Sequence, residues 1–179
     1  MVKTSNAIKK EKIMKSDQDN TAYLDIETSF AGYITIIGIY LPINTNSIQL
    51  IRPDISSFNL LEILNDNNVG VIKTYNGERF DLPVIKKQLG IDLSALYFHY
   101  DVMYLCWQNN LKGGLKAVEK QLGILRETQG VDGVEAMKLW EAWESKADKS
   151  ALDLLLKYNR EDIELLVKVE EILLKKSLK

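Results

Sequence analysis

Cysteine, proline and glycine are all scarce in this sequence, and the scarcity excludes several classes of protein. One cysteine, Cys106, in 179 residues rules out an internal disulfide and a metal site built from several thiolates, which fits a reducing compartment. Three prolines, ten glycines and 46% apolar residues are not the composition of a collagen-like, fibrous or disordered chain. The length suits one globular domain with a single sizeable core.

The sequence also lacks long apolar runs and an excess of either charge. Its longest apolar stretches, such as residues 34–41, are too short to span a bilayer. The N-terminus has no apolar signal core, so we expect a cytoplasmic protein without membrane contact. The 23 basic residues nearly balance 25 acidic ones, so the protein has no overall positive charge that would attract nucleic acid. Any contact with nucleic acid must therefore be local.

Hydrophobic patterning divides the chain into a polar tail and one folded domain. Residues 1–20 have little apolar periodicity, and we expect a flexible tail there and a domain over residues 21–179. Strand-like runs cover residues 22–28, 33–41, 47–51, 69–75 and 97–100, and helical spacing covers 58–64, 82–89, 101–110, 114–122, 133–145 and 150–175. The short connections between the first three runs indicate an antiparallel meander. We therefore predict an α/β fold with a mixed five-stranded sheet flanked by helices.

Two acidic residues lie in a strand that otherwise suits a core. Strand alternation places Asp25 and Glu27 side by side on one face, with Leu24 and Ile26 on the other. Neighbouring carboxylates repel each other, and burying them is costly unless cations or hydrogen-bond donors neutralise them. A bound metal ion would do so. The competing interpretation is a solvated strand end whose acids pair with lysines.

An acid also interrupts the apolar stripe of the last predicted helix. Tyr158 and Asp162 fall on the same stripe as Leu155. Their spacing of four residues projects the phenol and the carboxylate together toward the sheet. The alternative is that Asp162 lies at the edge of the stripe and pairs with Arg160 or Lys157.

A further acid follows the fourth predicted strand. Asn76 and Gly77 indicate a tight turn, and Asp81 lies two residues before Pro83 at the start of a predicted helix. This position is typical of a helix N-cap. If the first strand, this loop and the last helix present their carboxylates to one end of the sheet, four acids meet there.

Taken together, the three motifs resemble those of a known nuclease superfamily. The segments Asp25-x-Glu27, Asn76-x3-Phe80-Asp81 and Tyr158-x3-Asp162 follow the order of the three exonuclease motifs of the DnaQ-like superfamily, in its tyrosine (DEDDy) subclass. The flanking sequences LDIET, TYNGERFDLPVI and YNREDIELL look most like the YprB-type ribonuclease-H-like domains. Three motifs in the right order and on suitable elements are a more specific signal than any one of them.

The resemblance implies a ribonuclease-H-like fold and hydrolysis of phosphodiester bonds in DNA or RNA from a 3′ end. It also implies two divalent cations, Mg²⁺ or Mn²⁺, with Asp25, Glu27, Asp81 and Asp162 as metal ligands, and Tyr158 as the residue that positions the attacking water. Hard cations prefer carboxylate oxygens, and two of them can stabilise the attacking and leaving oxygens of an in-line displacement. The expected substrate is a single-stranded or frayed 3′ end.

The remaining predicted substrate contacts flank these motifs. They are Thr28, Asn76, Phe80 and Lys116. Lys116 shares a predicted helix face with other lysines, and a solvated basic face is an equally good interpretation. Because motifs that read bases are scarce, we expect recognition of the backbone and the strand end.

Several other polar and aromatic residues are expected to have structural roles. Asp101 and Asp132 have the positions of helix N-caps. His99 is expected to make a hydrogen bond at a strand end and not to act as a base. Met137 and Trp140 have helical spacing and are expected in the core, the alternative being base stacking.

Two other functions fit the same acids. A structure-specific endonuclease for RNA/DNA hybrids or branched DNA would use the same metal pair. A catalytically idle ribonuclease-H-like module would bind nucleic acid or a protein partner, and the sequence names no such partner. The lengths of the products and the binding of divalent ions distinguish the three.

Overall fold

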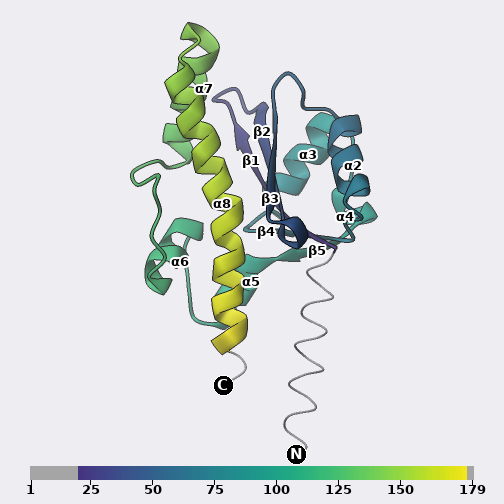
Figure 1. Cartoon of the computed structure of the whole chain (residues 1–179), viewed down its shortest axis with the longest axis vertical. Helices are drawn as coiled ribbons and strands as arrows, with labels where there is room; N and C mark the ends of the chain where they lie inside the picture. The colour runs from purple at the N-terminus through teal and green to yellow at the C-terminus, as the bar shows by residue number, and fades with distance from the viewer. Residues whose placement is uncertain (1–19, 177–179) are drawn as a thin grey trace, which may run out of the picture.

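A five-stranded mixed sheet forms the centre of the molecule (Figure 1). The computed structural model describes residues 20–176, and its strand order is β3-β2-β1-β4-β5. The antiparallel strands are β1 (Thr21–Thr28), β2 (Ile34–Leu41) and β3 (Asn46–Ile51), and the strands parallel to β1 are β4 (Val71–Thr74) and β5 (Phe98–Asp101). The predicted mixed sheet with its antiparallel meander is confirmed.

Helices cover both faces of this sheet (Figure 1). One face carries α2 (Ser57–Asp66), α3 (Asp81–Leu89) and α4 (Leu93–Leu96), and the other carries α5 (Val102–Gln108), α6 (Leu115–Leu122), α7 (Gly133–Lys146) and α8 (Lys149–Lys176). The sequence did not predict α4 or the short 3-10 helix η1 (Pro42–Asn44), because three or four residues are too few to show a period. Within residues 20–176, no helix combines the length and apolar character needed to cross a membrane.

Alternation along β1 divides its side chains between two cores. Leu24 and Ile26 pack with residues of α2 and α3, whereas Tyr23 packs against α5 and α8. Asp25 and Glu27 therefore belong to the face that α8 covers, as the alternation predicts. The last helix brings its own polar residues to the same face, because Leu155 and Leu166 on its stripe are buried there.

Most of the predicted capping and strand-end contacts are present. Asp101 accepts a hydrogen bond from the Met103 amide at 3.0 Å, and Asp132 accepts one from the Val134 amide at 2.9 Å, so both are N-caps. His99 Nε2 lies 2.9 Å from the hydroxyl of Thr74, which is the expected strand-end hydrogen bond.

The predicted tail over residues 1–20 lies outside the described residues, apart from its last residue. The carbonyl of Asn20 accepts backbone hydrogen bonds from Gly70 at 2.8 Å and from Val71 at 3.1 Å. β1 pairs with β4 from Thr21 onward, and this pairing holds the carbonyl of Asn20 in place. The division into a tail over residues 1–20 and a domain over residues 21–179 stays a prediction.

A glycine in β2 makes room for a polar side chain of α8. Gly38 lies opposite Asp25 in β1 and opposite Gln49 in β3. A Cβ atom at residue 38 would lie 2.3 Å from Oδ1 of Asn159. Only a residue without a side chain lets Asn159 approach the sheet here.

Substitution Gly38→Ala is expected to lower the free energy of unfolding by about 1–3 kcal/mol, because the added methyl group overpacks a buried site. Urea unfolding of the purified variant measures this loss. Gly133→Ala is the matched control, since a Cβ there meets no atom within 4 Å, and its stability should lie within about 0.5 kcal/mol of the parent. Equal stability of Gly38→Ala and the parent protein would contradict the packing described.

Candidate metal centre

Three carboxylates from two elements converge where β1 meets α8. Asp25 and Glu27 of β1 and Asp162 of α8 each offer an oxygen, and these oxygens all lie within 4.8 Å of one another. Glu27 and Asp162 are buried, and Asp25 is half-buried. The interpretation of Asp25 and Glu27 as a solvated strand end is therefore wrong, because α8 covers this face of β1.

Asp81 lies beside this group but outside the set of three. Its buried carboxylate accepts a hydrogen bond from the Ile26 amide at 3.0 Å. Strand β1 pairs with β4 over residues 21–23, and at Ile26 the Asp81 carboxylate takes the place of a strand partner. The predicted role as N-cap is wrong, because Asp81 is the first residue of α3 and the N-cap residue is Phe80, whose side chain makes no capping hydrogen bond.

Burial raises the pKa values of all four carboxyl groups. The pKa values of Asp25 and Glu27 lie well above their usual range, first because of burial and then because of the neighbouring acids. Burial likewise raises the pKa of Asp162 and raises that of Asp81 to about 7. The ionised cluster is thus unfavourable without added positive charge, which a divalent cation can supply.

Arg126, in the segment between α6 and α7, supplies positive charge to the cluster from within the protein. Its Nε lies 2.6 Å from Oε2 of Glu119 in α6, and its Nη2 contacts Oδ1 of Asp162. The guanidinium is buried, and its Nη1 has no hydrogen-bond partner among the described residues. The predicted alternative, in which Asp162 pairs with Arg160 or Lys157, is wrong, because α8 turns Asp162 inward toward Arg126.

Tyr158 and Lys116 form a second pair at the same place. Lys116 Nζ donates a hydrogen bond to the Tyr158 hydroxyl at 2.5 Å and lies 4.2 Å from the centroid of its ring. Burial and the carboxylates of Asp162 and Glu27 raise the pKa of Tyr158, so the phenol is neutral at physiological pH. Burial lowers the pKa of Lys116. The structure thus places Lys116 within the cluster and not on a solvated face.

Asn159 is a site residue that the sequence analysis missed. Its fully buried amide Nδ2 donates to Oδ2 of Asp25 at 3.0 Å, and its Oδ1 accepts from Gln49 Nε2 at 2.9 Å. These contacts connect β3, α8 and β1 and hold the Asp25 carboxylate in one orientation. Asn159 directly follows Tyr158 in the sequence, and this position could have indicated that it lies near the site. The apolar stripe of the helix, however, does not predict that the Asn159 side chain points toward the sheet.

Two clefts flank the acids and contain the predicted substrate contacts. One has a volume of about 460 Å³ and is lined by Asn76 and Lys116 together with Asp25, Tyr158 and Asp162. The other, of about 410 Å³, is lined by Thr28 and Phe80 together with Glu27 and the same three site residues. All nine residues predicted for the site therefore lie in the cluster or border it.

Comparisons with known proteins agree with this fold. A family model described as RNase_H superfamily matches residues 22–174. The chain belongs to the RNase_H superfamily. The family B DNA polymerase from the hyperthermophilic archaeon Pyrobaculum calidifontis has a similar structure, with a TM-score of 0.69 and 14% sequence identity over 86% of this chain. This chain spans 24% of that polymerase.

A second solved structure, described as the EXD2 exonuclease domain soaked in Mn and GMP, aligns with a TM-score of 0.40 and 17% identity over 83% of each chain. No curated protein sequence matches this chain. The polymerase, at 14% identity, shares the fold of this RNase_H superfamily member.

The residues of this RNase_H superfamily member fit a divalent cation. The three convergent donors are all carboxylate oxygens, which hard cations such as Mg²⁺ and Mn²⁺ prefer. Part of the positive charge at the cluster comes from Arg126, and a cation held by Asp25, Glu27 and Asp162 would supplement it. Thiolate and imidazole ligands are absent from the three-residue set, so the donors do not favour zinc.

In EDTA, the free energy of unfolding is expected to fall by about 3 kcal/mol between about pH 4.5 and pH 8. The pKa of Asp81 is about 7 in the folded protein and about 4 in the unfolded chain. Between these values the folded state binds a proton that the unfolded state has lost, so stability decreases as pH rises. Urea unfolding across this pH range measures the slope.

The same protein with Mn²⁺ should show the opposite trend, because a metal ion binds the ionised carboxylates more tightly as pH rises. Asp81→Asn removes one titrating group and should flatten the decline seen in EDTA. A metal-free stability that rises over this range would show that the carboxylates ionise more easily in the folded state than in the unfolded chain, which would contradict their raised pKa values.

Substitution Arg126→Leu is expected to lower the free energy of unfolding in EDTA by about 3–5 kcal/mol, because it leaves Asp162 and Glu119 buried without their partner. Saturating Mn²⁺ should recover part of this loss, since the ion compensates Asp162. Urea unfolding with and without Mn²⁺ measures both values. Arg160→Leu, at an exposed position of α8, is the control and should change stability by less than about 0.5 kcal/mol.

Proposed function

We propose that this domain is a metal-dependent nuclease that hydrolyses DNA or RNA from the 3′ end. The observation that carries the proposal is the convergence of Asp25, Glu27 and Asp162 between two open clefts. Membership of the RNase_H superfamily supports a nuclease. The order of the three sequence motifs, which resembles that of DEDDy exonucleases, supports the 3′-to-5′ direction.

The proposed metal ligands are Asp25, Glu27, Asp81 and Asp162. They would hold two divalent cations, Mg²⁺ or Mn²⁺, which when bound stabilise charge on the phosphoryl oxygens and lower the pKa of a bound water. The Asp81 carboxylate is held by a hydrogen bond from the amide of Ile26, the residue between the two acids of β1. Asn159 orients Asp25, so that the carboxylate does not need to reorganise when it binds a cation.

Tyr158 is suited to position a water molecule and not to deprotonate it. Its raised pKa keeps the hydroxyl protonated, and Lys116 donates to the oxygen of that hydroxyl. The hydroxyl also donates a hydrogen bond to the Asp162 carboxylate, which holds it beside the acids, where its oxygen would accept a further hydrogen bond from the attacking water. Lys116 also lines a cleft, where its positive charge would attract a phosphate group of the substrate strand.

The proposed substrate is a single-stranded or frayed 3′ end. Asn76 and Phe80 border the two clefts on the side of α3, where they would contact the nucleotides next to the scissile bond. A cytoplasmic location remains a prediction from the sequence.

Hydrolysis of labelled single-stranded oligonucleotides is expected with Mg²⁺ or Mn²⁺ and should disappear in EDTA. Asp162→Asn and Asp25→Asn should each lower the rate at least 100-fold, because a carboxylate ligand contributes several kcal/mol, and about 1.4 kcal/mol corresponds to a factor of ten. Asp153→Asn is the matched control, since Asp153 is an exposed acid of α8 paired with Lys149. Normal turnover in Asp162→Asn would refute the assignment.

The products distinguish the proposed exonuclease from its alternatives. A 5′-labelled strand should shorten stepwise from its 3′ end, and a circular single strand should resist digestion. Cleavage of the circle would identify an endonuclease. Calorimetry that detects no binding of millimolar Mn²⁺, together with no hydrolysis, would identify a module without catalytic activity.

A further inference from the structure

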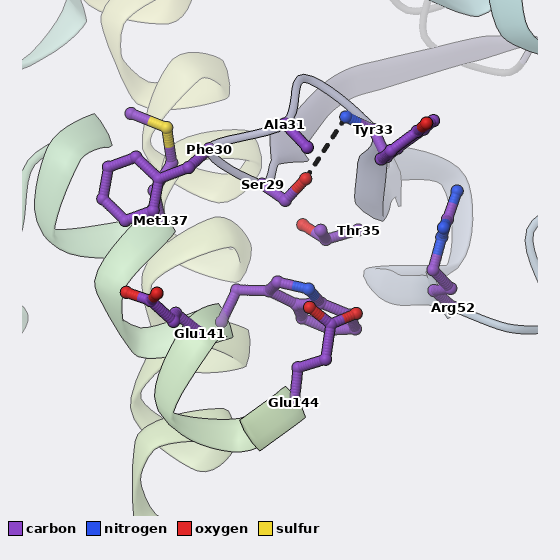
Figure 2. A pocket seen from close by; sticks show the side chains of 10 residues that line it. Ser29, Phe30, Ala31, Tyr33, Thr35, Arg52, Met137, Glu141 and Glu144 are labelled. Carbon is purple, nitrogen blue, oxygen red and sulfur yellow. Dashed lines mark hydrogen bonds between the residues drawn. The ribbon is translucent and has the colours of Figure 1, made fainter. Parts of the chain in front are cut away.

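A second pocket lies next to the proposed metal centre, between the β1–β2 turn, the end of β3 and helix α7 (Figure 2). Its volume is about 350 Å³, which is within the range of small-ligand pockets. Phe30 and Tyr33 of the turn and Trp140 of α7 give it aromatic walls. Phe30 and Tyr33 are more than half exposed although they are aromatic. The pocket is therefore suited to a flat aromatic ligand.

A buried hydroxyl in this pocket lacks a partner. Thr35 of β2 lines the pocket and is 1% exposed. Its Oγ1 makes no hydrogen bond within the described structure. Because a buried unpaired hydroxyl costs free energy, a ligand that bonds to it gains this energy on binding. Figure 2 shows Thr35 between the turn and Glu144.

Carboxylates from one helix complete the lining. Glu141 and Glu144 of α7 border the pocket, and neither has an ion pair with any residue of the part of the chain that the structure describes. Ionised carboxylates are acceptors only, so the pocket prefers a ligand rich in N–H donors. At the opposite edge, the Arg52 guanidinium lies 5.1 Å from the ring centroid of Tyr33 and is available to a phosphate.

The pocket and the metal centre adjoin each other. Thr28 borders the cleft of about 410 Å³ beside the acids, and the next residue, Ser29, borders the second pocket. Met137 of α7 lines both. A nucleic-acid strand at the metal centre would therefore pass beside the second pocket.

We propose that this pocket binds a guanine base of a nucleotide. Among the four bases, guanine presents two neighbouring N–H donors, N1–H and the N2 amino group, beside an acceptor, O6. The carboxylate of Glu144, which lies on the side of Thr35 in Figure 2, accepts from the two donors, and the Thr35 hydroxyl donates to O6. The aromatic walls stack on the base, as in other sites that read unpaired bases. The assignment of this guanine to a strand that is being degraded rests on the proposed function.

Titration of the ¹⁵N-labelled protein with each of four ribonucleoside 5′-monophosphates, in EDTA, tests the proposal. The resonances of the Trp140 indole and the Thr35 amide should shift with GMP. The Kd for GMP should be at least about fivefold below those for AMP, CMP and UMP, because a bidentate contact discriminates by at least this factor. EDTA removes divalent cations that would hold the phosphate group at the acids, so the titration reports binding of the base.

Two variants connect the binding to the named groups. Glu144→Gln and Thr35→Val, whose spectra also report that they fold, should each raise the Kd for GMP at least fivefold. Glu171→Gln, on α8 away from the pocket, is the matched control and should leave the Kd unchanged. Equal Kd values for the four nucleotides, shifts outside the pocket, or an unchanged Kd in both variants would overturn the proposal.

The nuclease assay and this titration fail independently. Hydrolysis without GMP binding would remove the guanine pocket and leave the proposed function intact. GMP binding without hydrolysis would support the guanine pocket and would indicate that its ligand is a free guanine nucleotide.

Discussion

The burial of like charges where β1 meets α8 is the constraint on which the surrounding structure depends. Asp25, Glu27 and Asp162 repel one another where water has little access, and the neighbouring groups compensate for this repulsion. The guanidinium of Arg126 contacts Asp162, and the amide of Asn159 donates to Asp25. Such a cluster is not expected in a region selected for stability alone, because apolar side chains would fill the same volume at lower cost. The arrangement is therefore better explained by cation binding than by packing.

Helix α8 couples this cluster to the core. The helix buries Leu155 and Leu166 against the sheet on the same stripe that carries Tyr158 and Asp162, so it cannot rotate without disturbing its apolar contacts. Near its other end, the Glu170 carboxylate accepts a hydrogen bond from Lys73 Nζ of β4 at 2.8 Å. Contacts at two levels of the helix fix its register against the sheet, and this register determines which oxygens of α8 face β1.

Short-range periodicity made part of this site predictable. A period of two placed Asp25 beside Glu27, and a spacing of four placed Tyr158 above Asp162, because both relations depend only on local geometry. Arg126 was not predictable, since its contact with Asp162 spans 36 residues and begins in a segment without regular structure.

The position of Asn159 and the role of Gly38 depend on register between elements. Strand pairing places Gly38 opposite Asp25, and helix packing then places Asn159 over Gly38. Asp81 shows the same limit: local sequence favoured a cap, but the Ile26 amide of β1 is its observed partner. Tertiary contacts of this kind override local preferences and leave no periodic pattern in the sequence.

Charge balance explains how the proposed base pocket and the proposed metal centre would act together. The formal net charge is −2, so the protein as a whole does not attract a polyanion. Lys116 at one cleft and Arg52 at the second pocket are local positive charges near the proposed path of a strand. The acids repel phosphate until cations neutralise them, whereas stacking and hydrogen bonds to a base depend little on that charge. A base pocket beside the acids therefore gives the strand an attachment point that does not depend on the overall field of the protein.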